Sequence, residues 1–407
     1  MNKLFYFIIL ITFVLVTATF FIFKKTPVNN EVVFWTLQMS DFAPYIEGVI
    51  SDFEEENPEI KIKWVDVPFS EGEKRTLASV LSDNPPDLVN LNPDFSATLA
   101  HKGTLYEISK SDLFQFNEEI INSIATDEKY YSIPWYATSA VTIYNKSLLA
   151  KAQINVPSTY SAIADFAPMV KRLTGAYITL PNITENDTML KILNKYGISN
   201  PADIKTSKGV EVFDMFKYMY SKDLIPKETV TITLQEALEK YMSGNIAVLN
   251  AGANFLNMIK ENAPQTYEIT DVAPQISGTL GQYDFSLMNF VIPKRAKHKD
   301  EALKFALFLT NEKNQLELAK LTNVLAVNKK ALQNDFYTKY DENDLTAKAR
   351  VISAKQLNKV RPVYRTQKGQ KEINNIVNAA VQEILLDKGD IQKILNRAAK
   401  QIKELQN

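Results

Sequence analysis

Aromatic and amide side chains recur where predicted strands and helices end. Trp35 closes the first predicted strand, and Asn92 and Phe95 follow a later one. Flat rings stack on the faces of sugars and amides bind hydroxyl groups, so this combination suits a neutral polar ligand. Core packing is the commoner role for any single ring, and the recurrence is what favours binding. The other members of the set are Trp135 and Tyr136, between two predicted strands, and Asn250, Asn254 and Phe255 around Gly252.

The stretch NPPDLVNLNPDF places polar groups directly after an apolar strand. Residues 87–91 are predicted to be a buried strand, and Pro93 ends it because proline has no N–H for the ladder. Asp94 can cap a helix that begins at 95 or 96. The turn is either an ordinary strand–helix connection or a rim that presents Asn92, Asp94 and Phe95 at the carboxyl end of a parallel strand. Open α/β sheets hold their ligands at that edge, and the two interpretations are compatible.

Residues for common catalytic mechanisms are scarce in this sequence. There is no cysteine, and neither of the two histidines, His101 and His298, has a partner nearby in sequence. The composition therefore excludes cysteine nucleophiles and disulfides and disfavours a histidine-activated nucleophile. No G-x-S-x-G, H-E-x-x-H or phosphate-binding G-K-[ST] pattern occurs. Paired carboxylates for glycoside hydrolysis stay open because such partners can lie far apart, but we expect no catalytic residue, no metal and no cofactor.

The totals describe an ordinary globular chain. Its 407 residues are 45% hydrophobic and carry a formal net charge of −1. The length predicts two domains, or three, and the charge gives no bulk field that would favour nucleic acid.

The amino terminus carries an uncharged apolar run from Leu4 to Phe23, followed by Lys24 and Lys25. As a helix this run would span about 30 Å of hydrocarbon. A cleavable signal peptide is the competing interpretation, with the small residues Val16-Thr17-Ala18 as its cleavage site. Cleavage there would leave FFIF near the mature start, so we favour residues 1–25 as an uncleaved anchor.

The first part of the body alternates strands and helices. The predicted order begins with a strand at 31–36 and a helix at 41–56. A second strand follows, in which Ile60, Ile62 and Trp64 alternate with lysines, and then a helix from Ser70 and a strand at 87–91. This order predicts parallel strands with crossover helices in a doubly wound α/β sheet. Later strands are predicted at 130–134, 140–145, 246–249, 272–274 and 286–292, separated mainly by helices.

Seven segments resemble, in order and spacing, the extracellular solute-binding proteins of ABC transporters, in the sugar-binding family that includes maltose-binding protein. The resemblance covers nearly all of the chain after Val32. It implies two α/β lobes, each a mainly parallel sheet flanked by helices, that close on a ligand at a hinge. Lobe one would comprise 31–138 plus 270–324, and lobe two 139–269 plus 325–407. The segments are EVVFWT, DFEEENPEIKIKW, NPPDLVNLNPDF, HKGTLYEI, YYSIPWYATSAVTIYNKSLL, MSGNIAVLNAGANFLNMI and EALKFALFLTNEKNQLELAK.

The resemblance also implies a set of cleft residues from both lobes and the hinge. The chain departs from the family in three ways: it lacks a lipidated cysteine, it has Asn254 where some sugar binders have an aromatic residue, and 178–190 lacks their aromatic clusters. The last two leave the size of the ligand open. The implied positions are Trp35, Asn92, Asp94 and Phe95 in lobe one; Trp135, Tyr136 and Ser139 near the hinge; Asn250, Gly252, Asn254 and Phe255 in lobe two; Arg361 or Tyr364 in the carboxyl-terminal segment; and Asn289.

The function that the resemblance implies is binding of a sugar or related polyol for delivery to the permease of an ABC importer. The protein would be an exported monomer, held at the membrane by its first residues, and a separate subunit would hydrolyse ATP. Two alternatives stay open. One is a membrane-tethered glycan-active enzyme, and the other is a glycerol-phosphate-type binding protein with Arg361 and Arg365 in a cationic pocket.

Overall fold

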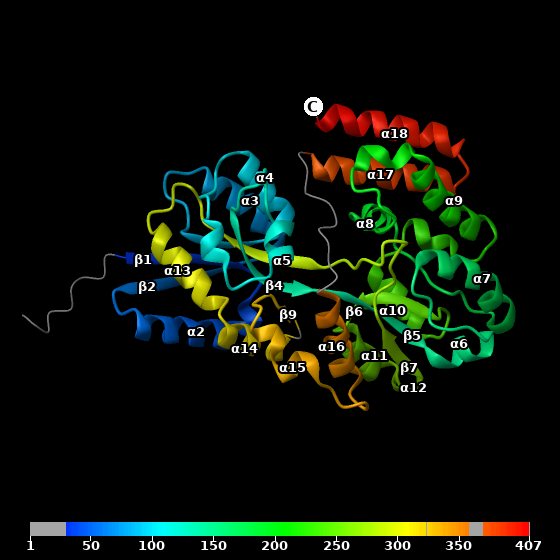
Figure 1. Cartoon of the computed structure of the whole chain (residues 1–407), viewed down its shortest axis with the longest axis horizontal. Coiled ribbons are helices and arrows are strands. Elements are labelled where there is room, and N and C mark those ends of the chain that lie inside the picture. The colour runs from blue at the N-terminus through cyan, green and yellow to red at the C-terminus, as the bar shows by residue number, and fades with distance from the viewer. Residues whose placement is uncertain (1–29, 323, 358–368, 407) are drawn as a thin grey trace, which may run out of the picture.

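The computed structural model describes residues 30–322, 324–357 and 369–406, which form two α/β lobes side by side (Figure 1). Lobe one contains β1 (Asn30–Leu37), and lobe two contains β5 (Ala140–Asn145). The predicted segment 1–25 and the candidates Arg361 and Tyr364, with Arg365, lie outside the described residues. Within the described ranges, no helix is both long and apolar enough to cross a membrane.

Lobe one is built on a six-stranded sheet with the order β2-β1-β3-β8-β4-β9. The first strands pair in parallel, β1 with both β2 and β3, as the alternation of strands and helices predicts. The other strands of this sheet are β2 (Ile60–Val67), β3 (Leu88–Leu91), β4 (Ser132–Thr138), β8 (Ser286–Val291) and β9 (Leu325–Ala326).

Helices cover both faces of this sheet. On one face, Phe305 packs against both Phe34 and Phe53 in a core that also includes other residues of the adjacent helices. On the other face, Leu37, Val89 and Leu99 belong to a second core. The first face is covered by α2 (Ala43–Glu56), α13 (Lys299–Leu309) and α14 (Glu312–Thr322), and the second by α3 (Phe69–Val80) and α4 (Pro93–His101).

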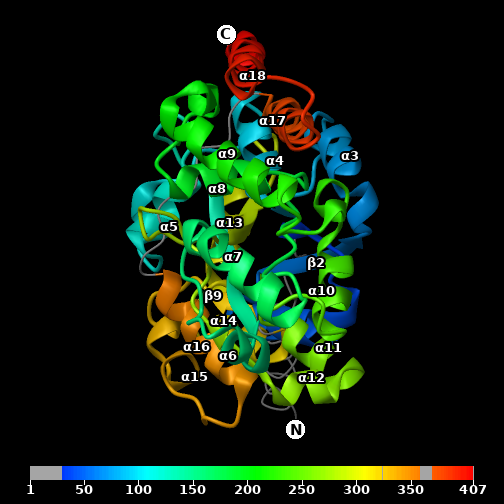
Figure 2. The same ribbon diagram turned by 90° about the vertical axis from the view of Figure 1, so that its right-hand side faces the viewer.

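Lobe two is built on a three-stranded sheet with the order β6-β5-β7, where β6 is Val248–Gly252 and β7 is Thr270–Ala273. At one end of the lobe, the last two helices lie against α9 and α8 (Figure 1 and Figure 2). The helices of this lobe are α6 (Lys146–Ala152), α7 (Tyr160–Thr174), α8 (Thr188–Lys195), α9 (Ser207–Ser221), α10 (Leu234–Met242), α11 (Phe255–Asn262), α12 (Pro264–Glu268), α17 (Gln370–Leu385) and α18 (Ile391–Gln406).

The two-lobe α/β architecture is confirmed, but the expectation of mainly parallel sheets is wrong outside β1–β3. β8 pairs antiparallel with β3 and β4, β9 pairs antiparallel with β4, and β5 pairs antiparallel with β6 and β7. The reason is the route of the chain between the lobes. β4 leads out of lobe one and β8 leads back into it, so the two strands lie side by side in opposite directions.

Two strands belong to the other lobe from the one that the sequence analysis predicted. β7 was expected in lobe one but pairs with β5, and β9 was expected in lobe two but pairs with β4. The chain therefore returns to lobe one after the loop 274–285 rather than at 270. Helix α16 (Leu345–Leu357) contributes to both cores, with Ala349 in that of lobe two and Leu357 in that of lobe one. We propose that lobe one comprises 30–138 and 286–338, and lobe two 140–285 and 369–406.

Candidate ligand-binding site

In lobe one, the carboxyl ends of neighbouring strands meet at one edge of the sheet. Leu37 lies opposite Val67 at the ends of β1 and β2, and β3 runs parallel beside β1 and ends at Leu91. Trp35 and Phe95 lie near this edge, and both are half-buried against the core shared by α3 and α4. The structure therefore brings together Trp35, Asn92, Asp94 and Phe95, as the position of ligands in open α/β sheets predicts.

Asn92, and not Asp94, caps helix α4. Its side-chain oxygen accepts a hydrogen bond from the N–H of Phe95 at 2.8 Å, and its amide nitrogen donates to Glu73 at 3.3 Å. The predicted cap at Asp94 is wrong because the helix begins at Pro93, whose missing N–H costs nothing in the first turn. Asp94 is exposed in that first turn, where the positive end of the helix dipole favours its carboxylate.

The guanidinium group of Arg75 lies over the indole ring of Trp35. The guanidinium carbon of Arg75 lies 5.6 Å from the ring centroid, and Arg75 also pairs with Glu71 at 3.6 Å. All three side chains come from β1 and α3, so the covered ring belongs to the rim of lobe one. A sugar ring that stacks on this side of Trp35 would take the place of Arg75.

Trp135 and Tyr136 lie within β4, not between two strands. Trp135 is 0% exposed and packs against Phe290, with ring centroids 4.6 Å apart. The predicted stacking role of Trp135 is therefore contradicted in this structure, because its ring is a core side chain of lobe one. Tyr136 is half-buried, and burial raises its pKa to about 12, so its hydroxyl stays neutral and able to donate.

Asn289 is a buried amide with no hydrogen bond to its side chain among the described residues. It is 0% exposed, stands opposite Leu91 and Pro134 in the sheet, and neither its oxygen nor its nitrogen has a partner. An unpartnered amide in a core is costly, so this position calls for a polar neighbour. In this structure Asn289 lies beneath the rim and is not exposed at it.

The candidates of lobe two gather at the end of β6. Gly252 pairs with Ala140, directly after the hinge residue Ser139, and Asn254 is exposed just before α11. A Cβ on Gly252 would lie 2.4 Å from the side-chain oxygen of Asn254, so a larger residue there would push this exposed side chain aside. Phe255 is half-buried against the lobe-two core, and the buried oxygen of the Asn250 side chain has no hydrogen-bond partner among the described residues.

Ser139 is the single residue between β4 and β5, and its hydroxyl is engaged within the hinge. It donates to the carbonyl of Asp284 at 3.2 Å and accepts from the amide of Gln356 at 3.0 Å. These partners belong to the return crossover and to α16. Ser139 therefore joins hinge segments in this structure. Because it is only 8% exposed, it offers little surface to a ligand.

Helix α8 presents a charged pair that the sequence analysis missed. Lys191 lies 3.1 Å from Asp187, one turn earlier. Burial lowers the pKa of Lys191, but Asp187, Asp284 and Asp94 raise it, and the net shift is upward. Asp94 belongs to lobe one, so its charge acts on Lys191 across the two lobes. The spacing of Asp187 and Lys191 was a usable signal for an ion pair, but only the tertiary structure shows that the pair faces lobe one.

Gln38 is a further residue that the sequence analysis missed. It directly follows β1, is exposed and has a φ of 51°, which is uncommon for a residue other than glycine. Its N–H donates to the carbonyl of Val67 at 2.9 Å, which closes the rim between β1 and β2. Residues held in this conformation cluster at ligand sites, so Gln38 joins the candidates.

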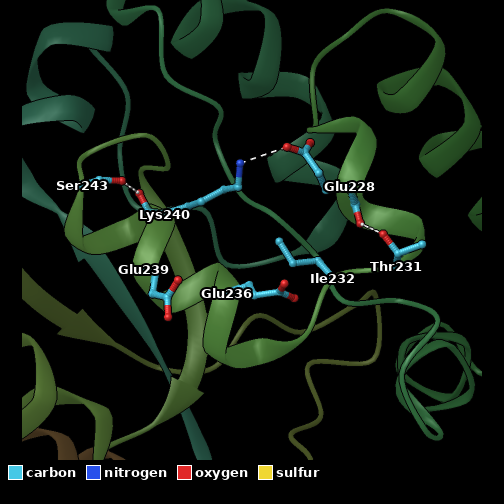
Figure 3. Close-up of a pocket in the computed structure, with 7 residues that line it drawn as sticks. All are labelled: Glu228, Thr231, Ile232, Glu236, Glu239, Lys240 and Ser243. Atoms are coloured by element: carbon cyan, nitrogen blue, oxygen red, sulfur yellow. Dashed lines mark hydrogen bonds and ion pairs between the residues drawn. The ribbon is translucent and has the colours of Figure 1, made fainter.

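The pocket in Figure 3 lies within lobe two and has a volume of about 440 Å³. The side chains of Glu228 and Lys240 form an ion pair at 3.0 Å on its wall, and Glu236 caps α10 together with Thr233. None of the candidate residues lines this pocket. In the parts of the chain that the structure describes, no group of three or more His, Cys, Asp or Glu side chains could hold a metal ion.

Two α/β lobes joined by crossover segments are the architecture of two-lobed solute-binding proteins. The sequence pattern of the bacterial extracellular solute-binding protein family matches residues 48–344, and the chain belongs to this family. The resemblance inferred from the sequence motifs is thereby confirmed.

Several bacterial proteins resemble the chain along most of its length. It is 23% identical over 404 residues to the galactooligosaccharide-binding protein of Bacillus subtilis, covering 93% of this chain and 90% of that protein. It is 26% identical over 298 residues to the multiple sugar-binding protein of Streptococcus mutans, covering 67% and 69% of the two chains. A candidate oligosaccharide periplasmic-binding protein from Synechococcus sp. MITs9220 superposes with a TM-score of 0.80 at 28% identity, covering 92% of this chain and 98% of that one.

Proposed function

We propose that this chain is the extracytoplasmic substrate-binding subunit of an ABC importer and that it binds a saccharide or related polyol between its lobes. The observation that carries the proposal is the similarity, along nearly the whole chain, to a galactooligosaccharide-binding protein. The half-buried Trp35 at the same rim as Asn92 and Phe95 supports it, because rings recognise the face of a sugar and an amide recognises its hydroxyl groups.

The proposed mechanism is closure of the lobes on the ligand. Asn92 and Asp94 on lobe one and Asn250 and Asn254 on lobe two would touch the ligand together only in the closed form. A ligand that contacts both lobes binds that form better and shifts the population toward it. A change from mostly open to mostly closed requires several kcal/mol of preference for the closed form.

The closed monomer would then dock on the membrane permease, and a separate subunit would hydrolyse ATP. The sequence has no phosphate-binding G-K-[ST] pattern, which supports this division of labour. The chain would release its ligand unaltered, since its family and relatives are binding proteins rather than enzymes.

We expect a cognate oligosaccharide, monosaccharide or polyol to stabilise the purified protein. Ligand at 100 times its Kd should raise the free energy of unfolding by about 2.7 kcal/mol, because it binds the folded state and not the unfolded chain. A thermal-shift screen of sugars, polyols and phosphoesters finds the ligand. Small-angle scattering at saturating ligand should then give a smaller radius of gyration than the empty protein.

Two outcomes would contradict this assignment. Stabilisation by phosphoesters alone would move the ligand to the glycerol-phosphate class. Recovery of a chemically altered saccharide after incubation would make the protein a glycan-active enzyme. An unchanged radius of gyration with bound ligand would reject the clamp while leaving binding intact.

We further propose that residues 1–25 hold the protein at the membrane. The motivation is the uncharged run Leu4–Phe23 in a chain that has no cysteine for lipidation. Fractionation of cells that express the full chain should place the protein in the membrane fraction with Met1 or Asn2 at its amino terminus. A soluble product that starts at Thr19 would identify a cleaved signal peptide instead.

A further inference from the structure

Lys195, at the end of α8, places a buried ammonium group against the crossover that returns to lobe one. Its side chain is 1% exposed. The Nζ atom contacts Oδ2 of Asp284 at 2.7 Å, the side-chain oxygen of Gln275 at 3.0 Å and the carbonyl of Ile276 at 2.8 Å. These acceptors come from both ends of the loop 274–285, so one cation clamps the two ends of the crossover.

The backbone of Lys195 holds the same loop from the other side. Its carbonyl accepts a hydrogen bond from the N–H of Leu280 at 3.1 Å. A Cβ on Gly278 would lie 2.5 Å from that carbonyl oxygen, so the loop can approach α8 this closely only with glycine there. The middle of the loop is therefore attached to α8 as well as its ends.

The clamped crossover is continuous with the other segments that pass between the lobes. The N–H of Gln275 donates to the side chain of Gln356 on α16 at 2.6 Å, and the N–H of Asp284 donates to the side chain of Gln275 at 2.7 Å. The amide of Gln356 in turn donates to the hydroxyl of Ser139 and to the carbonyl of Ala140, both at 3.0 Å. One hydrogen-bonded network thus includes the outgoing crossover, the returning crossover and the end of α16.

We infer that Lys195 is a positioning residue of the hinge, which makes the loop 274–285 a rigid part of lobe two and confines lobe movement to the residues that follow Asp284 and flank Ser139. Lys195 touches no proposed ligand-binding residue by a hydrogen bond or ion pair given above, so it acts through the orientation of the lobes. The inference rests on the proposed function only where ligand affinity is used to measure that orientation.

The chemistry of the pair agrees with a positioning role. Transfer of an ammonium and a carboxylate out of water is costly, so buried ion pairs are weak sources of stability. Such a pair fixes geometry instead, because each charge needs its hydrogen-bonding partners at short distance. Three oxygen acceptors match the three N–H donors of a lysine ammonium, which leaves the group little freedom to reorient.

The test measures the separation of the lobes directly. Because the chain has no cysteine, Glu47→Cys on α2 and Asp214→Cys on α9 place one spin label on each lobe, both at exposed positions. We compare the parent with Lys195→Met, which keeps the length of the side chain but removes its charge. The control is Lys217→Met, which breaks an ion pair of the same 2.7 Å length between Lys217 and Asp387, within lobe two and away from the crossovers.

We expect Lys195→Met to broaden the distribution of label distances in the empty protein and to raise the Kd of the ligand found by the screen roughly tenfold, a typical size for coupling between a remote element and a binding site. Lys217→Met should change neither quantity. A distance distribution and a Kd equal to those of the parent would overturn the inference. If no ligand is found, the proposed function fails, but the distance distribution still decides the role of Lys195.

A second variant protects the test against simple unfolding. Lys195→Met combined with Asp284→Asn removes both charges, so that no unpaired carboxylate is left in the site. The double variant should have a thermal midpoint closer to that of the parent than Lys195→Met has, and should keep the broadened distance distribution. A narrow distribution in the double variant would assign Lys195 to stability alone.

Discussion

Replacing Trp135 by alanine is expected to lower the free energy of unfolding by about 3–5 kcal/mol, the usual cost of removing a large aromatic side chain from a core. The ring is 0% exposed and packs against Phe290 and Tyr136. The backbone carbonyl of Trp135 also accepts a hydrogen bond from Gln315, which fixes the strand beside the cavity that the substitution would create. Urea unfolding of the purified variant measures the loss.

Trp135→Phe is the matched control, because it keeps an aromatic ring and removes the indole N–H. That N–H has no hydrogen-bond partner among the described residues, so its loss should cost little beyond the change in volume. We expect Trp135→Phe to be clearly more stable than Trp135→Ala. Unchanged stability in Trp135→Ala, combined with weaker ligand binding, would make this ring a stacking surface after all.

Replacing Trp35 by alanine is expected to weaken ligand binding by about 1–3 kcal/mol, the range of an aromatic hot spot. Trp35 is half-buried at the rim of lobe one, where its ring has a partly exposed surface, in contrast to Trp135. Isothermal titration with the ligand identified by the screen measures the change. The same experiment on Phe255→Ala examines the corresponding ring of lobe two.

Arg75→Ala separates the ring from the cation that covers it. It keeps Trp35 and removes the guanidinium 5.6 Å from the ring, so a ligand no longer has to displace that group. We expect the affinity to be maintained or improved if the sugar stacks on the covered side. A loss as large as that of Trp35→Ala would instead make Arg75 a ligand contact.

For Trp35→Ala itself, a large drop in the free energy of unfolding with unchanged ligand affinity would show that the ring serves the core.

Local patterns in the sequence predicted many of the elements well. The alternation of Ile60, Ile62 and Trp64 with lysines predicted a strand that the structure places in β2. Ile373, Val377 and Ile384 have the spacing of one helix face, and α17 buries this face in the core of lobe two. These predictions succeed because the period of apolar side chains depends on the geometry of the element itself.

The site was predictable only in part, because the environment of a side chain depends on distant segments. The position of Trp135 in the sequence resembles that of a ring at a strand end, but β8 pairs with β4 and places Phe290 against it. Asn92 and Asp94 are equally good caps in isolation, and the start of α4 at Pro93 decided between them. The pair of Asp187 and Lys191 gave no sign in sequence that Asp94 lies near it.

The sequence by itself determined many of the helices and strands, the early parallel strands and the family, because each depends on residues close together or on motifs in a fixed order. The tertiary structure decided which sheet receives β7 and β9, which rings are core and which are rim, and that Lys195 meets Asp284. Strand pairing and burial of a charge join residues far apart in the chain. Their free energy depends on the partner that the fold brings to them, and no local pattern records that partner.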